Sequence, residues 1–253
     1  EKLTFSSSLD TESNFWNMEN LTEINIPKNE NFQFKYDGGL LFEKTNFTND
    51  NYDKLFFVPY FIKKVTIPTN VKIIAMGSLC YSEIEEIFIP SSVVKIEPLG
   101  FGSIKLKKVV FDVNTKFISI DGFAFDYTNI KSISLPSGEI DFKPYWCHET
   151  NKLTEIKVPE SNDQLKFENG ILYGKTDKKS DNFDLLIFAS RDIEIVNIPS
   201  SVKMILTCAF YRCRKIKEFN IPKNSQLSSI KKSAFAFSSA ESISIPVSVS
   251  EIQ

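Results

Sequence analysis

The chain has 253 residues, of which 42% are hydrophobic and 23 are phenylalanine, so it can form a long apolar core. Its formal net charge of -2 gives no general attraction to nucleic acid or to anionic membranes. A membrane-spanning helix needs about 18 or more consecutive apolar residues, and the sequence has no such run.

A short motif of alternating apolar residues followed by proline recurs along the whole chain. It reads Leu-Thr-Glu-Ile-Asn-Ile-Pro at 21–27, and copies follow at 65–68, 84–90, 106–112, 130–136, 153–159, 196–199, 216–222 and 242–246. Most copies are 22 to 24 residues apart, and two intervals are about 40. A fixed period of this size is typical of a solenoid, in which each coil contacts only its neighbours.

Each coil contains three apolar segments, which are clearest at 200–222. The Ile-x-Ile segment before proline has period two and predicts a half-buried strand, which proline ends because it lacks an N–H group. Val202 and Ile205 predict a second short extended segment. Ala209 and Phe210 predict a helical turn whose phenylalanine enters the core. Stacked copies then form parallel strands about 4.8 Å apart.

Two longer repeat units, at about 28–68 and 160–199, are related to each other. Residues 34–45 align without gaps to 165–176, and the alignment continues to Pro68 and Pro199. Each unit predicts a strand, a turn at Gly39 or Gly170, a second strand, a polar loop and a third strand. The units either are enlarged coils that continue the stack or project hairpins that bind a partner.

We expect residues 1–253 to form a single repeat solenoid of about nine coils. The chain begins at Glu1 without methionine and ends at Gln253, part-way into a new repeat. These two features predict a fragment of a longer chain.

The repeated run Leu-x-x-Ile-x-Ile-Pro-x-x-Val-x-x-Ile-x-x-x-Ala-Phe-x-x-Cys, best preserved between Leu153 and Cys213, resembles the BspA-like leucine-rich repeat family. The resemblance covers essentially the whole chain. Local departures are Asp112 in place of proline, Pro98-Leu-Gly-Phe at 98–101, and Tyr145-Trp146 in place of Ala-Phe. The expected fold is an α/β leucine-rich-repeat solenoid, predominantly parallel β with short helical turns, curved and right-handed.

Proteins of this family are surface or secreted molecules of oral bacteria and mucosal protozoan parasites. The resemblance implies a non-enzymatic adhesion module and surface antigen at the cell surface or secreted. It would recognise host cells or extracellular-matrix proteins such as fibronectin and fibrinogen. The resemblance implies no catalytic residue and no cofactor.

The residues themselves give little sign of catalysis or of a metal site. The single histidine, His148, follows Cys147, but adjacent residues rarely point at one another, and we expect a histidine on a surface turn. Asp-Asn-Tyr-Asp at 50–53 and Asp-Asn-Phe-Asp at 181–184 could bind calcium, although both lack the glycine and bidentate glutamate of a calcium loop. No carboxylate pair recurs from coil to coil, as a polysaccharide-cleaving solenoid would need.

The four cysteines are too few for a disulfide scaffold. We expect buried free thiols, with a disulfide between Cys208 and Cys213 as the alternative.

The candidate ligand-contact face consists of the outward positions of the repeated strand. These positions are Glu23, Asn25, Lys64, Thr66, Glu86, Phe88, Lys108, Val110, Glu155 and Lys157. Glu23, Lys64, Glu86 and Lys108 alternate in sign and are expected to pair across neighbouring strands. Phe88 and Val110 form an apolar patch between charges, and we expect this patch to anchor a protein partner. The alternative is that both residues only favour strand formation.

Two sequons, Asn20-Leu-Thr and Asn46-Phe-Thr, make Asn20 and Asn46 candidate N-glycosylation sites if the protein is secreted by a eukaryote. The alternative function is a structural spacer or stalk without a ligand of its own. The ligand face and the spacer role differ in whether an exposed patch binds a partner.

Overall fold

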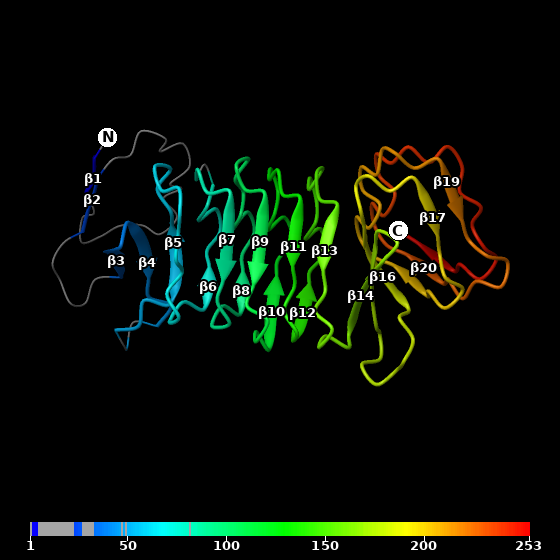
Figure 1. Cartoon of the computed structure of the whole chain (residues 1–253), viewed down its shortest axis with the longest axis horizontal. Coiled ribbons are helices and arrows are strands. Elements are labelled where there is room, and N and C mark those ends of the chain that lie inside the picture. The colour runs from blue at the N-terminus through cyan, green and yellow to red at the C-terminus, as the bar shows by residue number, and fades with distance from the viewer. Residues whose placement is uncertain (1, 5–22, 27–32, 47, 49, 81) are drawn as a thin grey trace.

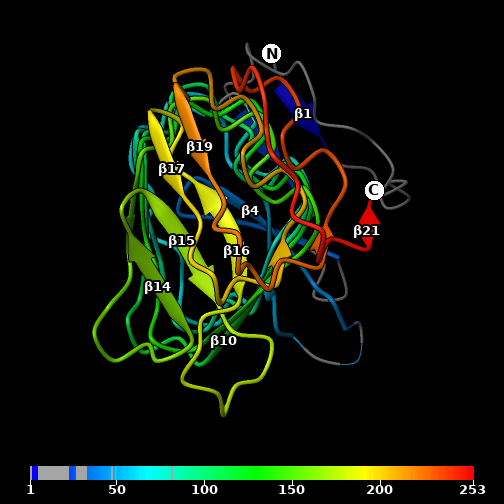
Figure 2. The ribbon, with the colours of Figure 1, turned by 90° about the vertical axis from the view of Figure 1, so that its right-hand side faces the viewer.

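The computed structural model describes residues 2–4, 23–26, 33–46, 48, 50–80 and 82–253. Figure 1 shows the coils following one another along the long axis, and Figure 2 shows them overlying one another when viewed along that axis. The described residues form 21 short strands in five sheets and no α-helix. The described part of the chain therefore contains no helix that could cross a membrane.

The repeated Ile-x-Ile segments form the first side of the coils. Four of them make a parallel sheet in the order β13-β11-β9-β7, with the bounds β7 Glu86–Ile89, β9 Lys108–Phe111, β11 Ser132–Ser134 and β13 Glu155–Lys157. Ile87 and Ile89 are buried whereas Glu86 and Phe88 are exposed, so the predicted inward and outward positions alternate as expected. Two further pairs, β1 (Lys2–Thr4) with β2 (Glu23–Asn25) and β17 (Ile195–Asn197) with β19 (Glu218–Asn220), form separate sheets.

The second extended segments form the other side of the coils. A seven-stranded sheet has the order β12-β10-β8-β6-β5-β4-β3. Its bounds are β3 Phe34–Asp37, β4 Leu40–Glu43, β5 Lys54–Phe57, β6 Ile73–Ile74, β8 Lys95–Ile96, β10 Phe117–Ile120 and β12 Glu139–Phe142. A six-stranded sheet, β14-β15-β16-β18-β20-β21, follows. Its bounds are β14 Leu165–Glu168, β15 Ile171–Gly174, β16 Leu185–Ala189, β18 Met204–Ile205, β20 Ser229–Ile230 and β21 Glu251–Ile252.

The prediction of helical turns at the Ala-Phe segments is wrong. Each segment is a pair of tight turns that contains residues with positive φ, such as Leu99 at 57° and Phe123 at 64°. The N–H groups of these turns bond to the next coil, as Leu99 N does to Phe123 O at 3.0 Å. An α-helix needs those N–H groups for its own i−4 carbonyls, so hydrogen bonding between coils excludes it. A parallel-rich β-solenoid is otherwise confirmed.

The aromatic residues of the Ala-Phe segments line the core, where successive coils stack their rings, and Phe235 in the last of these segments is half-buried. The rings of Phe101 and Phe125 are 5.1 Å apart, and those of Phe210 and Phe235 are 5.2 Å apart with an interplanar angle of 4°. Trp146 takes the phenylalanine position in the irregular coil and packs 6.2 Å from Phe125. The departure at Tyr145-Trp146 therefore keeps an aromatic core residue.

The two long units share their internal contacts as well as their sequence. In each, an antiparallel hairpin turns at a glycine with positive φ, Gly39 at 84° and Gly170 at 78°. The following polar loop is closed by a threonine hydroxyl that donates to an aspartate, Thr45 to Asp53 at 2.8 Å and Thr176 to Asp184 at 2.6 Å.

The two sequences considered as calcium sites, 50–53 and 181–184, lie in these loops. Asp53 and Asp184 instead accept hydrogen bonds from their own loops, and Asp184 also lies 3.2 Å from Lys203. The loop between β15 and β16 extends beyond the outline of the coils in both views (Figures 1 and 2).

Candidate functional site

The longest continuous part of the predicted ligand face is the outer surface of the four-stranded sheet β7, β9, β11 and β13. The parallel register places Glu86, Lys108, Ser132 and Glu155 in one row across the four strands. A second row contains Phe88, Val110, Ser134 and Lys157. Phe88 is 52% exposed, and Val110 beside it is half-buried. The structure thus brings six of the predicted contact residues onto one face.

The charges of this face are organised by ion pairs between neighbouring coils. Lys108 Nζ lies 2.6 Å from Glu86 Oε1, as the alternating charges predicted, and Lys107 Nζ lies 2.7 Å from Glu85 Oε1. The hydrogen bond from Lys107 and its positive charge lower the pKa of Glu85. Lys157 instead pairs within its own strand, 3.2 Å from Glu155. Phe88 and Val110 therefore lie beside a Glu86–Lys108 pair that is already satisfied.

The other predicted contact residues lie away from this sheet. Lys64 and Thr66 are exposed in a segment without assigned strand structure, and no ion pair joins Lys64 to Glu86 in the described part of the chain. Asn25 is exposed on β2, which pairs with β1. The side chain of Glu23 lies outside the described residues. Within the described residues, the predicted charge alternation is thus realised for Glu86 and Lys108 and not for Lys64 and Glu86.

Of the two sequons, Asn20 lies outside the described residues, and Asn46 is exposed. The Oδ1 atom of Asn46 accepts hydrogen bonds from Thr48 N at 2.9 Å and from Thr48 Oγ1 at 2.7 Å. The asparagine and threonine of this sequon are therefore in direct contact on the surface.

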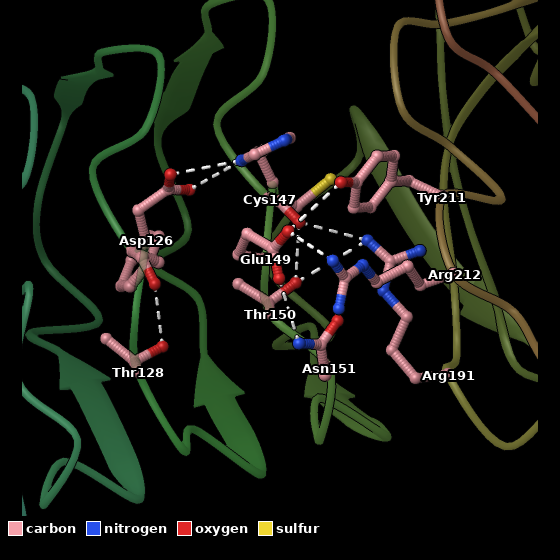
Figure 3. A network of polar contacts seen from close by, with 11 residues as sticks. Asp126, Thr128, Cys147, Glu149, Thr150, Asn151, Arg191, Tyr211 and Arg212 are labelled. Atoms are coloured by element: carbon pink, nitrogen blue, oxygen red, sulfur yellow. Dashed lines mark hydrogen bonds and ion pairs between the residues drawn. The ribbon is translucent and has the colours of Figure 1, made fainter. Parts of the chain in front are cut away.

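A buried polar network that the sequence did not reveal lies where the second long unit meets the preceding coil (Figure 3). Arg191 is only 5% exposed, and its guanidinium stacks 4.6 Å from the ring centroid of Phe188. Its Nη2 donates to Cys147 O at 3.0 Å, and its Nη1 donates to Ala209 O at 3.2 Å. No carboxylate pairs with it among the described residues. Arg191 thus connects coils that are about 40 residues apart in sequence through backbone carbonyls.

Glu149 forms the second bridge across the same junction. Its Oε1 lies 2.8 Å from Arg212 Nη2 and accepts a hydrogen bond from Tyr211 Oη at 3.1 Å. Burial opposes ionisation of Glu149, but hydrogen bonds from Asn151 and Tyr211 and the charge of Arg212 outweigh it and lower its pKa. Figure 3 shows Arg191 and Arg212 approaching Glu149 and Cys147 from the same side. These contacts make the network a connector between coils.

His148 is half-buried, which corrects the expectation of a histidine on a surface turn. Its Nδ1 lies 3.0 Å from Asp126 Oδ2, and its ring lies 4.7 Å from that of Tyr211. Burial raises the pKa of Asp126 to about 6, although the hydrogen bond from His148 acts in the opposite direction. The sequence missed this pair because the two residues come from different coils.

The thiols provide no activated nucleophile. All four cysteines are free, so the buried-thiol interpretation is correct for Cys147, Cys208 and Cys213, while Cys80 is half-buried. Cys147 Sγ points to Cys208 O at 3.9 Å, away from a pairing with His148. Burial raises the pKa of the Cys147 thiol and brings that of Cys208 to about 12. Thiols of this kind are unreactive core groups.

Comparison with known proteins agrees with this repeat architecture. A family model described as BspA type leucine rich repeat region matches six copies within residues 49–171 and 182–253. No curated protein matches the sequence. A leucine-rich repeat protein from Eubacterium ventriosum is 17% identical and has a TM-score of 0.56, covering 87% of this chain and 67% of its own.

Two further solved structures are similar over most of this chain. The pneumococcal vaccine antigen PcpA is 18% identical, with a TM-score of 0.46 and coverage of 85% of this chain and 71% of its own. A leucine-rich repeat protein from Bacteroides ovatus is 19% identical, with a TM-score of 0.35 and coverage of 99% and 74%. At these identities, only the Eubacterium structure supports the fold, and it supports nothing beyond the fold.

Because Arg191 bridges neighbouring coils, its removal should strongly reduce the stability of the fold. Arg191→Ala removes two charge-assisted hydrogen bonds and the contact with Phe188, and should lower the free energy of unfolding by about 3 kcal/mol. The two carbonyls keep one donor each, Thr150 Oγ1 for Cys147 O and Ala189 N for Ala209 O. Arg191→Lys should not restore stability, because an ammonium cannot reproduce the planar guanidinium fork. Urea unfolding measures the free energy of unfolding of both variants. Exposed Arg214→Ala is the control, and equal losses for Arg191 and Arg214 would contradict the bridging role.

The raised pKa of Asp126 predicts a specific pH dependence of the free energy of unfolding. Burial raises the pKa of Asp126 from 3.8 to about 6 in the folded protein. The protonated carboxyl therefore contributes to stability in full below pH 3.8, and this contribution is lost as pH rises through about 6. The Asp126→Asn variant lacks this titration, so its stability relative to wild type should increase between pH 4 and 7, by about 2–3 kcal/mol. Urea unfolding across this range tests the trend. Exposed Asp163→Asn is the control, and a constant difference for Asp126→Asn would disprove it.

Proposed function

Because the chain belongs to the BspA-type leucine-rich repeat family, as its motifs predicted, we propose that it is a non-enzymatic binding module of a cell-surface or secreted protein. Its partner would be a protein of the host cell surface or extracellular matrix, of the fibronectin or fibrinogen kind that the resemblance implies. The proposed contact face is the outer surface of β7, β9, β11 and β13.

The exposed side chain of Phe88 is the observation that carries this proposal. A phenylalanine that is 52% exposed in the middle of a regular strand contributes nothing to the core below it. Val110 lies next to it in register and extends the apolar surface onto β9. Aromatic residues surrounded by polar groups are frequent anchors of protein–protein contacts.

The polar residues around Phe88 support selective rather than general adhesion. The Glu86–Lys108 pair on one side and Lys157 further along the second row present both signs of charge. A partner must match this arrangement or leave charges unpaired, and such mismatches reduce affinity for incorrect partners. The inward residues of the same strands are buried and set only the scaffold.

A structural spacer remains the second candidate function, and the ladders of ion pairs favour it. Lys107 pairs with Glu85, and Lys217 pairs with Glu194 at 2.8 Å, each across two successive coils. These contacts stabilise the stack without any ligand. A spacer needs exposed residues that are mutually satisfied, which describes the charges but not Phe88.

Asn46 is the proposed attachment site for an N-linked glycan. The hydrogen bond from Thr48 Oγ1 to Asn46 Oδ1 and the exposure of both residues support this assignment. Peptide mass spectrometry of native material before and after glycosidase treatment should show a glycan mass on the peptide that contains Asn46. An unmodified Asn46 in secreted native protein would rule the site out.

Phe88→Ser tests the contact face. The variant should lose at least tenfold in affinity for the matrix protein that the wild type binds, measured on immobilised fibronectin and fibrinogen, because truncation of an anchor typically costs about 2 kcal/mol. Its unfolding midpoint should be nearly unchanged, since the side chain is exposed. Ile195→Ser, at a 54% exposed residue on the separate strand β17, is the matched control.

Two results would contradict the proposed face. One is unchanged binding of Phe88→Ser to every matrix protein that the wild type binds. The other is an equal loss in Ile195→Ser, which would place the contact elsewhere. Wild-type protein that binds neither matrix protein nor host cells would favour the spacer.

A further inference from the structure

The strand β12 ends its sheet, and its outer backbone edge is unpaired among the described residues, whereas β6, β8 and β10 each pair with the next strand of the sheet. In the preceding coils, Val94 O accepts a hydrogen bond from Ser119 N at 2.9 Å, and Ile96 O accepts one from Asp121 N at 3.0 Å. Ile120 O likewise accepts from Lys143 N at 3.0 Å. The parallel register makes Ile140 and Phe142 the equivalent residues of β12.

Their backbone groups point away from β10. Glu139 N bonds to Lys116 O at 2.9 Å and Lys143 N bonds to Ile120 O, so alternate residues of β12 face β10. Ile140 and Phe142 therefore direct their N–H and C=O groups to the other side, and the described residues provide no hydrogen-bond partner there. This edge offers two donors and two acceptors in the spacing of a parallel strand.

The second long unit explains why the next rung of the sheet is missing. Its hairpin, β14 and β15, comes between β12 and β16, and neither strand of the hairpin pairs with β12. The hairpin is instead connected to this strand by the ion pair of Lys178 with Glu139 at 2.7 Å. Asn162 Nδ2 donates to Gly138 O at 3.3 Å, just before β12 begins. The start of the edge is thus occupied, whereas its middle is open.

Two cavities lie along this edge. One, of about 150 Å³, is lined by Ile140, Leu165, Leu185 and Ile187, and lies towards the start of β12. The other, of about 280 Å³, is lined by Phe142, Pro144, Trp146 and Leu206 at its end. The wall of the larger cavity is largely apolar. The smaller cavity is mixed, because Glu139, Gln164, Lys175 and Lys178 also line it. The lysines at the rim of the larger cavity, Lys143 and Lys231, already pair with Asp141 and Glu251 at 2.7 and 2.8 Å.

We propose that the β12 edge binds an extended peptide segment of a partner protein by strand addition, with apolar side chains at alternate positions entering the two cavities. The free N–H and C=O groups of Ile140 and Phe142 specify an extended backbone, because only a strand matches their spacing. At the larger cavity, the apolar wall and the paired lysines specify an uncharged side chain. The expected sequence resembles β10 and the segment around β8, which place Ile118 and Ile120, or Val94 and Ile96, at the equivalent positions.

The protein's own β10 segment provides a defined probe. A blocked peptide Lys-Phe-Ile-Ser-Ile-Asp, a copy of residues 116–121, should bind the full chain and slow hydrogen exchange of the Ile140 and Phe142 amides at least tenfold at saturation. The amides of Glu139 and Lys143 already bond to β10 and should change little, which gives an internal control.

Two modified peptides separate strand addition from simple apolar contact. In the protein, Ser119 N and Asp121 N of this segment donate to Val94 O and Ile96 O of the preceding coil. The serine and aspartate of the peptide should donate to β12 in the same way. N-methylation at these two positions should abolish binding, whereas N-methylation at the two isoleucines should leave the edge that faces β12 intact. On the protein, Thr207→Trp should fill the larger cavity and weaken binding at least tenfold, with Thr207→Ser as its control.

The proposal is overturned if the unmodified peptide does not bind, or if it binds without slowing exchange at Ile140 and Phe142. Equal binding of the two methylated peptides would also overturn it, because the backbone edge would then not be used. Phe88→Ser should leave peptide binding unchanged, so this site and the proposed matrix-binding face can fail independently.

Discussion

The structure depends on backbone hydrogen bonds that pass from each coil to the next. A single coil can neither bury its apolar residues nor satisfy its N–H and C=O groups, whereas a stack does both. This constraint explains the straight parallel registers, the stacked phenylalanines and the absence of helices at the described Ala-Phe corners. Leu99 and Phe123 adopt positive φ although glycine would do so more easily, because their N–H groups bond to the following coil.

The second long unit is the place where this continuity is reduced. Between the coil that ends in β13 and the long unit, the main-chain bond from Arg191 N to Leu153 O at 3.0 Å is joined by side-chain bridges from Arg191, Glu149 and Arg212. The core remains continuous, since Trp146 packs 5.9 Å from Phe188 across the junction. Side chains therefore replace part of the hydrogen bonding that backbone atoms provide elsewhere.

The sequence predicted the period of the coils and the inward and outward alternation of their strands. The period identified the coils, and the alternation in each strand correctly placed Ile87 inward and Phe88 outward. The pairing of Glu86 with Lys108 followed from the same register. The corners were predicted wrongly because local preference for a helical turn ignores hydrogen bonds to a neighbouring coil. The Arg191 and His148 contacts could not be predicted, because they join different coils and occur once, without a repeated pattern.

The long axis of the stack is also the direction in which its hydrogen bonds lie, and this has a mechanical consequence. Under tension along that axis, successive coils carry the load in series, and regular boundaries distribute it over several main-chain bonds. At the boundary before the second long unit, fewer main-chain bonds cross, and more of the same force falls on side-chain bridges such as those of Arg191 and Glu149. Extension should therefore begin between β12 and β14, while the coils on either side remain folded.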